Sequence, residues 1–323
     1  MGEENCVSVT DFTGKISEGG GCVAAVGFFD GVHLGHRYLL RRVVELARQK
    51  ELAAMAVTFA CHPREVLDTD YRPQILTTTT EKLRLLAACG VDACAVLHFD
   101  KAMSAMSSRE FMSEILLRCL GVRCLLIGYD HRFGHDRNAG FADYCREGRE
   151  MGIEVLPAEA YKPGGLAVSS SLVRRLLNGG LVERAAQCLG RPYSLEGKVV
   201  NGKKVGRTIG FPTANLLPDD CRKLIPARGV YAVKAMTEEG KTYPAMLNIG
   251  LRPTIDDHRG VTIETHLFDF SGDLYGTTLR LQFMERLRDE MKFPSLERLR
   301  EQLAEDARKA RAVLENENAT VLK

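Results

Sequence analysis

The sequence predicts a Rossmann-like α/β domain followed by a small antiparallel β-barrel domain with a C-terminal helix. In the first half, apolar runs alternate with amphipathic stretches, which is typical of a parallel sheet covered by helices on both faces. In the second half, short alternating segments separated by turn residues indicate a barrel. Between these two sequence patterns, Gly190-Arg191-Pro192 ends a predicted helix. We therefore predict two domains, residues 1–189 and residues 190–323.

The first domain is expected to contain strands joined by helices. The strands are predicted over residues 23–28, 53–59, 93–99, 124–127 and 153–156. Apolar residues at helical spacing predict helices around residues 39–47, 83–87 and 111–116. A last helix pair is predicted over residues 169–177 and 181–189, because the glycine and proline that follow cannot continue a helix.

The second domain is expected to be made of short strands. They are predicted over residues 231–235, 245–249, 261–268 and 278–283. The turn signals are Asn201-Gly202, Glu239-Gly240 and Ser271-Gly272-Asp273, and the first of these, between valine-rich flanks, predicts a tight hairpin. From Ser295 onward, leucines and alanines at helical spacing predict an amphipathic helix that is capped by Ser295 and packs on the barrel.

Composition and charge narrow the class of protein. Apolar residues make up 45% of the chain and charged residues 27%, as in an ordinary soluble globular protein. A net charge of +2 falls short of the basic balance of nucleic-acid binders, so we expect no nucleic-acid partner. No apolar run is long enough to span a bilayer and the first twenty residues lack a signal-peptide pattern, so we expect a cytoplasmic protein with no membrane partner.

The cysteines are expected to be buried thiols. The sequence has 10 cysteines but no CxxC pair. Cys89, Cys94, Cys119 and Cys124 interrupt apolar stretches as small hydrophobic residues do. Their scattered spacing disfavours a zinc site or a disulfide framework.

A first candidate site follows the first buried strand, at Gly27-Phe28-Phe29-Asp30-Gly31-Val32-His33-Leu34-Gly35-His36. In a doubly wound sheet, phosphates bind at the free amides of the helix that follows a strand, and glycines let the backbone approach them closely. His33 and His36 are three residues apart and can project from one helical face toward one phosphate. Imidazole donors there stabilise the charge of an α-phosphoryl group under attack, which predicts nucleotidyl transfer. The alternative is that His33 only caps the helix and His36 is exposed.

Far along the chain, Val168-Ser169-Ser170-Ser171-Leu172-Val173-Arg174 opens another helix with hydroxyls and a cation, which by itself suits an ordinary N-cap. Together, the two segments resemble the HxGH nucleotidyltransferase superfamily, and specifically the FMN adenylyltransferase module of bacterial bifunctional FAD synthetases, over residues 22 to about 187. The resemblance implies that ATP is held by Gly27, Phe29, Asp30, His33, His36, Ser170, Ser171 and Arg174, with His33, His36 and Arg174 as catalytic residues. It also implies flavin contacts at Asp130 and Phe133.

Some positions depart from the pattern of that family. Ser171 stands where the family usually has threonine, Cys61 replaces a usual proline, and His131 replaces an aromatic residue. Ser171 keeps the hydroxyl, whereas His131 can alter the contacts to the flavin.

A second candidate site lies in the barrel half, at Gly206-Arg207-Thr208-Ile209-Gly210-Phe211-Pro212-Thr213-Ala214-Asn215. Glycines, hydroxyls and cations of this kind can cradle a polyphosphate, although a solvated basic hairpin is the alternative. The oxygens of Thr213 and Asn215 suit Mg²⁺, which prefers a few protein oxygens together with phosphates and water. Glu264 lies on an alternating strand and is either a rim charge or a base for phosphoryl transfer, and its position alone favours the structural role.

The segment from Pro212 to Asn215 is similar to the signature of riboflavin kinases, and further matches in the order of that family cover about residues 190–310. The resemblance implies a flavokinase barrel in which Gly206, Arg207, Gly210, Thr213 and Asn215 hold ATP, with Thr213 and Asn215 as ligands of Mg²⁺. It makes Glu264 the base that activates the ribityl hydroxyl. It also implies that Arg288 and Phe293 lie near the flavin.

Both motif sets in one chain indicate a bifunctional enzyme. It is expected to phosphorylate riboflavin with ATP to FMN, and then to transfer AMP from ATP to FMN, giving FAD and pyrophosphate. The expected partners are these small molecules, with Mg²⁺ as cofactor, and the sequence sets no oligomeric state. The alternatives are the loss of one activity, a flavin or RNA binding module without catalysis, and another acceptor such as nicotinamide mononucleotide or phosphopantetheine. The intact motifs disfavour the loss of one activity, and the near-neutral charge disfavours RNA binding. The flavokinase half makes FMN the expected acceptor.

Overall fold

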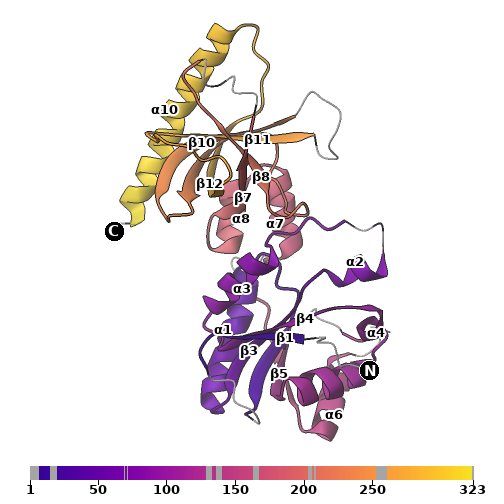
Figure 1. The fold of residues 1–323 in the computed structure, drawn as a ribbon. Helices are drawn as coiled ribbons and strands as arrows, with labels where there is room; N and C mark the ends of the chain where they lie inside the picture. The colour runs from indigo at the N-terminus through magenta and orange to yellow at the C-terminus, as the bar shows by residue number, and fades with distance from the viewer. Residues whose placement is uncertain are drawn as a thin grey trace. The chain divides into compact units, whose positions relative to one another are not determined.

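The computed structural model describes residues 7–14, 20–68, 70, 72–128, 133–135, 140–162, 167–202, 206, 209–251 and 260–321. The chain divides into two compact units, Met1–Ser170 and Ser171–Lys323, here called unit 1 and unit 2 (Figure 1). None of the helices within the described residues is long and apolar enough to cross a membrane.

Unit 1 is built on a six-stranded sheet with the order β1-β4-β3-β2-β5-β6. Its strands are β1 (Val7–Asp11), β2 (Cys22–Val26), β3 (Ala53–Phe59), β4 (Ala93–Leu97), β5 (Val122–Gly128) and β6 (Glu154–Ala158). Strands β2 to β6 are parallel and confirm every strand predicted for this half, with small shifts at their ends. β1 pairs antiparallel with β4 at the edge of the sheet, and it escaped prediction because its residues are mostly exposed and form no apolar run.

Helices cover both faces of this sheet (Figure 1). α1 (Leu34–Gln49) and α3 (Thr79–Ala87) pack on one face, whereas η1 (Phe111–Cys119) and α6 (Phe141–Met151) pack on the other. η1 is a π-helix, and the Leu120 N–H that follows it donates to Ile115 O, five residues earlier, at 3.1 Å. The short helices are α2 (Pro63–Leu67), α4 (Lys101–Ser104) and α5 (Ser108–Glu110).

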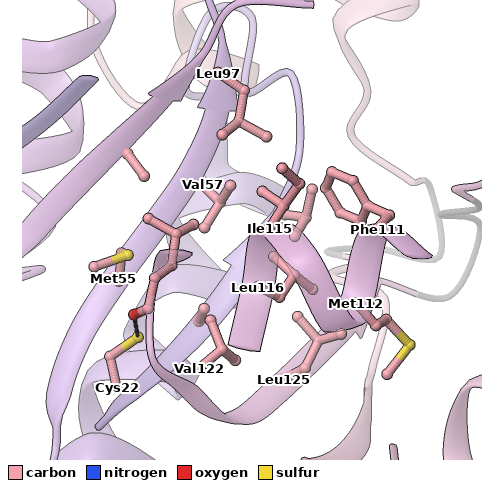
Figure 2. Close-up of a cluster of buried hydrophobic side chains, with 14 of the residues drawn as sticks. Cys22, Met55, Val57, Leu97, Phe111, Met112, Ile115, Leu116, Val122 and Leu125 are labelled. Carbon is pink, nitrogen blue, oxygen red and sulfur yellow. Dashed lines mark hydrogen bonds between the residues drawn. The ribbon is translucent and has the colours of Figure 1, made fainter. Parts of the chain in front are cut away.

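Figure 2 shows the core between the sheet and η1. Strand residues meet helix residues here, namely Met55, Val57, Leu97, Val122 and Leu125 against Phe111, Met112, Ile115 and Leu116. Cys22 Sγ donates to Leu120 O at 3.3 Å, and burial raises the pKa of Cys22 to about 12, so this side chain stays a thiol. Cys94 and Cys124 are buried as predicted, whereas Cys119 is exposed, because it lies on the outer side of η1, and was predicted wrongly.

Unit 2 contains a closed barrel with the strand order β10-β11-β8-β7-β12-β9 (Figure 1). Its strands are β7 (Tyr193–Val200), β8 (Ala214–Pro218), β9 (Gly229–Thr237), β10 (Thr242–Leu251), β11 (Val261–Leu267) and β12 (Thr278–Arg288). All neighbouring strands are antiparallel, which confirms the predicted barrel. The helices are α7 (Ser170–Asn178), which begins at the last residue of unit 1, α8 (Val182–Leu189) and α10 (Leu296–Val321).

The predicted turns had different outcomes. Glu239-Gly240 forms the tight turn between β9 and β10, with Gly240 at a φ of 79°. Asn201-Gly202 does not form a two-residue hairpin, since the partner strand of β7 begins only at Ala214. A Cβ on Gly202 would collide with the Asn215 side chain unless that side chain moved. The glycine lets the backbone pass directly against that side chain.

α10 is tied to the barrel by apolar packing and by a buried ion pair. Ser295 Oγ accepts a hydrogen bond from Arg298 N–H at 3.3 Å, which confirms the predicted cap. Asp306 is fully buried and accepts hydrogen bonds from Arg288 Nη2 at 2.7 Å and Gln302 Nε2 at 3.0 Å. The carboxylate has protein donors in place of water, so the loss of a partner would leave a buried charge unpaired.

Replacing Asp306 with alanine should destabilise the protein by about 3–5 kcal/mol, because it leaves the Arg288 guanidinium without its carboxylate partner. The matched control is Glu301→Ala on the same helix, whose ion pair with Arg298 is exposed and contributes at most about 1 kcal/mol. Urea unfolding followed by circular dichroism compares the two variants. Equal shifts of the unfolding midpoint in both would contradict a stabilising role for the buried pair.

Two candidate active sites

The first site is built on the turn that connects β2 to α1. Its backbone is left-handed at Phe29, Gly31 and Val32, with φ angles of 51°, 79° and 39°. This conformation costs about 1–3 kcal/mol at a non-glycine residue, so surrounding contacts must hold it. Backbone hydrogen bonds run from Gly27 N–H to Val57 O at 2.9 Å and from Val32 N–H to Phe29 O at 3.1 Å. They attach the turn to β3 and close it on itself.

Asp30 is the main anchor of this turn. Its side chain is 3% exposed and accepts hydrogen bonds from the backbone N–H groups of Leu76 at 2.9 Å and Thr77 at 3.0 Å. The Thr77 hydroxyl donates to the same carboxylate at 3.2 Å and accepts from Gly31 N–H at 3.0 Å. Asp30, which the sequence assigns to ATP binding, therefore fixes the shape of the loop.

The two predicted histidines lie together at the start of α1. His33 is the N-cap residue, and its Nδ1 accepts a hydrogen bond from His36 N–H at 3.3 Å. The two rings are stacked, with centroids 3.6 Å apart and planes 18° apart, and the Phe29 ring meets His36 edge-on at 5.2 Å. His33 is buried and His36 half-buried. Of the alternative interpretation, the cap is observed at His33, whereas His36 is not exposed.

The environment of His36 holds its ring in the neutral form. Burial lowers the pKa of His36 well below its ordinary value, and the charges of His33 and Lys82 lower it further. Within the described part of the chain, the buried His36 Nδ1 has no hydrogen-bond partner.

Lys82 is a further residue of this site, and its role was missed in the sequence. It lies on α3, its side chain is 2% exposed, and its Nζ donates to Phe28 O at 3.1 Å and to Phe59 O at 2.9 Å. Burial lowers the pKa of Lys82 to about 8. The available signal was its spacing, because Lys82 precedes the buried Leu86 by four residues and therefore shares the core-facing side of the helix.

The other residues predicted for adenylyl transfer are placed as follows. Ser170 Oγ donates to Asp30 O at 2.9 Å, so Ser170 joins the same loop. Ser171 and Arg174 belong to unit 2, and Arg174 lies one turn after Ser170 on α7. Phe133 stacks on Tyr144, with centroids 4.2 Å apart, and thus packs against the core. Asp130 lies outside the described residues, as does His131.

The second site is built on the strand register of the barrel. Glu264 of β11 lies opposite Asn215 of β8 on one side and opposite Asn248 of β10 on the other. Directly opposed residues of neighbouring strands share a face of the sheet, so the carboxylate lies between two amide side chains. Glu264 and Asn215 are half-buried, whereas Ile263 and Thr265 of β11 are buried on the opposite face. The structure brings the predicted Glu264 and Asn215 together and adds Asn248 to them.

The loop before β8 is shaped by glycines and held by a histidine. Gly206 O accepts from Phe211 N–H at 2.8 Å, and Gly210 has a φ of 85°, which favours glycine. His266 Nδ1 lies 2.7 Å from Pro212 O, and since a carbonyl only accepts, the ring donates. This bond fixes Pro212, the residue before Thr213, against β11. Arg207 lies outside the described residues.

Thr213 faces a hollow and is not sealed in apolar packing. It lines a cavity of about 100 Å³ together with Thr265, Leu267, Phe270 and Tyr275 among others. Thr265 Oγ1 is buried and has no hydrogen-bond partner within the described ranges. The cavity therefore offers hydroxyl groups among apolar walls.

Of the two residues predicted to lie near the flavin, Arg288 is the last residue of β12 and Phe293 lies in the connection from β12 to α10. The Arg288 guanidinium bonds Asp306 and lies 5.7 Å from the centre of the Phe293 ring. Glu290, between them in sequence, accepts from Leu251 N–H at 3.4 Å. This segment therefore adjoins β10, the strand that carries Asn248.

Comparisons with known proteins assign one family to each half of the chain. A family model described as FAD synthetase matches residues 15–172, and one described as riboflavin kinase matches residues 189–314. The chain is 40% identical over 291 residues to the bifunctional riboflavin kinase/FMN adenylyltransferase of Escherichia coli (strain K12), which covers 90% of this chain and 92% of that relative. The chain belongs to the bifunctional riboflavin kinase/FMN adenylyltransferase family. It phosphorylates riboflavin and transfers an adenylyl group to FMN, as both motif sets predicted.

Other relatives have the same two activities in their names. The bifunctional riboflavin kinase/FMN adenylyltransferase of Pseudomonas fluorescens is 37% identical over 293 residues, covering 91% of this chain and 93% of its own. The protein of the same name from Haemophilus influenzae is 35% identical over 292 residues, which cover 90% of this chain and 94% of that relative. A solved structure from Streptococcus pneumoniae, described as a macrolide-efflux protein, has a TM-score of 0.84 and 31% identity and covers 92% of this chain and 95% of its own. This similarity supports the fold.

His36 should stay neutral at pH values where an ordinary histidine takes up a proton. In the unfolded chain it protonates near pH 6.5, whereas in the folded chain its pKa is lower, so the unfolded state binds more protons as the pH falls below about 6.5. The free energy of unfolding should therefore decrease on acidification by more in the wild type than in His36→Gln. Nitrogen-15 NMR titration of the ring and urea unfolding at pH 7 and 5.5 measure both effects. A titration midpoint of 6.5 or higher would contradict the neutral ring.

Proposed function

We propose that AMP transfer takes place at the loop containing His33 and His36 and that riboflavin phosphorylation takes place at Glu264. Each cluster lies within the segment matched by the corresponding family model. For AMP transfer, the supporting observation is the stacked pair of imidazoles at the start of α1. For phosphorylation, it is the register that sets Glu264 between Asn215 and Asn248.

In AMP transfer, a phosphate oxygen of FMN attacks the α-phosphorus of ATP, and the bond from that phosphorus to the bridging oxygen breaks, releasing pyrophosphate. His33 and His36 stabilise the charge that collects on the α-phosphoryl oxygens, together with the N–H groups of α1. Gly27, Phe29 and Asp30 bind ATP as parts of this loop, and the Asp30 carboxylate also holds the loop in shape. Ser170, Ser171 and Arg174, at the start of α7, bind the phosphates, which suits a helix N-terminus with hydroxyls and a cation.

In phosphorylation, Glu264 accepts the proton of the ribityl hydroxyl as its oxygen attacks the γ-phosphorus of ATP. The bond from the γ-phosphorus to the bridging oxygen breaks, and ADP leaves. Asn215 and Asn248 flank the carboxylate and orient it by hydrogen bonding. Gly206, Arg207, Gly210 and Thr213 form the loop that holds ATP, with the Thr213 cavity beside it.

Mg²⁺ is proposed to bind at Thr213 and Asn215. No group of three or more His, Cys, Asp or Glu side chains able to hold a metal occurs among the described residues. Magnesium needs no such group, since it is commonly held by a few protein oxygens together with phosphates and water. The hydroxyl and amide oxygens of these two residues fit that requirement. When bound, the ion neutralises charge on the transferred phosphate.

Each domain is proposed to have its own flavin-contacting residues. Asp130 and Phe133 contact the flavin during AMP transfer, and Arg288 and Phe293 contact it during phosphorylation. The adenylyltransferase domain is proposed to span residues 1–189 and the kinase domain residues 190–323. The kinase model starts at residue 189, which supports this boundary, whereas the FAD synthetase model ends at residue 172 and the compact units divide after Ser170. The enzyme acts in the cytoplasm on small molecules and has no nucleic-acid or membrane partner.

Replacing Glu264 with glutamine should lower FMN formation from riboflavin by at least about 10²-fold, because glutamine cannot accept the hydroxyl proton. Conversion of supplied FMN to FAD should not change. Chromatography of the flavins after incubation with Mg-ATP measures both rates, with Glu239→Gln in the exposed β9–β10 turn as the control. If Glu264→Gln keeps the kinase rate, Glu264 is not the base.

Replacing both His33 and His36 with alanine should have the reverse effect. FAD formation should fall by at least about 10²-fold, because the donors to the α-phosphoryl oxygens are lost, while riboflavin phosphorylation persists. The control is His98→Ala, an exposed histidine that contacts Ser8 at the edge of the sheet. Loss of both activities in the double variant would speak against separate sites.

A further inference from the structure

We propose that Lys82 is a positioning residue for AMP transfer, which holds the loop that presents His33 and His36. The inference rests on the proposed role of these histidines. Lys82 does not belong to the loop, since it reaches it from α3, a helix on the same face of the sheet as α1. Its ammonium joins the loop to the end of β3.

The contacts of Lys82 fix one peptide group of the loop. Its Nζ donates to Phe28 O at 3.1 Å, and the Thr58 hydroxyl donates to the same oxygen at 3.0 Å. This carbonyl belongs to the peptide bond that enters Phe29, the first left-handed residue of the turn. Two donors on one carbonyl set the direction of that peptide, and therefore the direction in which the Phe29 ring points.

The Phe29 ring in turn contacts His36. Its edge-on contact, with ring centres 5.2 Å apart, limits the position of the His36 imidazole. His33 also stacks on the His36 ring, with ring centres 3.6 Å apart. A Cβ on Gly27 would lie 3.0 Å from the Phe29 ring, so this ring also packs closely on the start of the loop. A chain of contacts thus leads from the Lys82 ammonium through Phe28 and Phe29 to His36.

A buried ammonium is costly, which makes a purely space-filling role a poor explanation for this lysine. Its side chain is 2% exposed, and burial of a charged group costs free energy unless hydrogen bonds and charges compensate. Here the compensation comes from two carbonyl groups, from the Phe28 ring at 4.4 Å and from the charge of Asp30. An apolar residue would fill the same space without holding the carbonyl groups.

The charge of Lys82 also acts on His36. Burial is the largest cause of the lowered pKa of His36, and the charges of His33 and then Lys82 lower it further. Burial also lowers the pKa of Lys82, while Asp30, Cys94 and Cys61 raise it. Removal of the ammonium should therefore raise the pKa of His36 toward its ordinary value. A residue that only stabilised the fold from a distance would leave this value unchanged.

The test compares Lys82→Met with Arg84→Met, which changes an exposed residue of the same helix. In the full-length enzyme, Lys82→Met should lower kcat for FAD formation from FMN and ATP by about 10²-fold, because displacement of a catalytic group by about 1 Å has an effect of that size. Riboflavin phosphorylation should stay unchanged, and NMR should show a higher pKa for His36. Arg84→Met should keep both rates.

Wild-type kcat for FAD formation in Lys82→Met, or an unchanged His36 pKa, would overturn the proposal. If Lys82→Met does not fold, Thr58→Val decides, because it removes the second donor to Phe28 O; a several-fold lower kcat is expected, and an unchanged kcat overturns the proposal. His36→Gln separates the two hypotheses. If His36→Gln keeps FAD formation, the proposed role of the histidines fails. If His36→Gln loses FAD formation while Lys82→Met keeps it, only the proposed role of Lys82 is overturned.

Discussion

The hydrogen bonds of the buried Asp30 carboxylate are the constraint on which the first site depends. They run to the backbone of Leu76 and Thr77, in a segment far from Asp30 in sequence, and they hold a turn whose φ angles are positive at Phe29 and Val32. A turn with this strain would relax without such an anchor. With this anchor in place, His33 lies at the start of α1 and the His36 ring stacks on the His33 ring. The geometry of the histidines is therefore set by a carboxylate that need not touch the reacting atoms.

The second site depends on register instead of strain. In a closed barrel each strand has a partner on both sides, so a single polar residue acquires two opposed neighbours. Glu264 gains Asn215 and Asn248 in this way. A shift of one residue would turn Glu264 to the face where Ile263 and Thr265 are buried. The packing of the barrel thus fixes the position of the Glu264 carboxylate.

Arg288 and Lys82 each stabilise the fold beside a candidate site. Arg288 forms a buried ion pair with Asp306 of α10 and at the same time belongs to the segment that adjoins β10. Lys82 holds two carbonyl groups in unit 1 and carries a charge that acts on His36. In both cases the long side chain of a cation connects elements that are distant in sequence.

The sequence by itself determined the α/β and barrel classes, the five parallel strands of unit 1, four of the six barrel strands, and the segments that contain the histidines, Thr213, Asn215 and Glu264, but it missed β7, β8 and α6. The predicted features follow from local pattern, because apolar periodicity and glycine spacing are properties of neighbouring residues. It did not determine the exposed edge strand β1, the long connection after Asn201-Gly202, or the parts played by Lys82 and Asn248. Only the tertiary structure decided these, because they depend on which strand pairs with which and on which carbonyl a buried side chain reaches. Such contacts join residues far apart in the chain, and no local pattern records them.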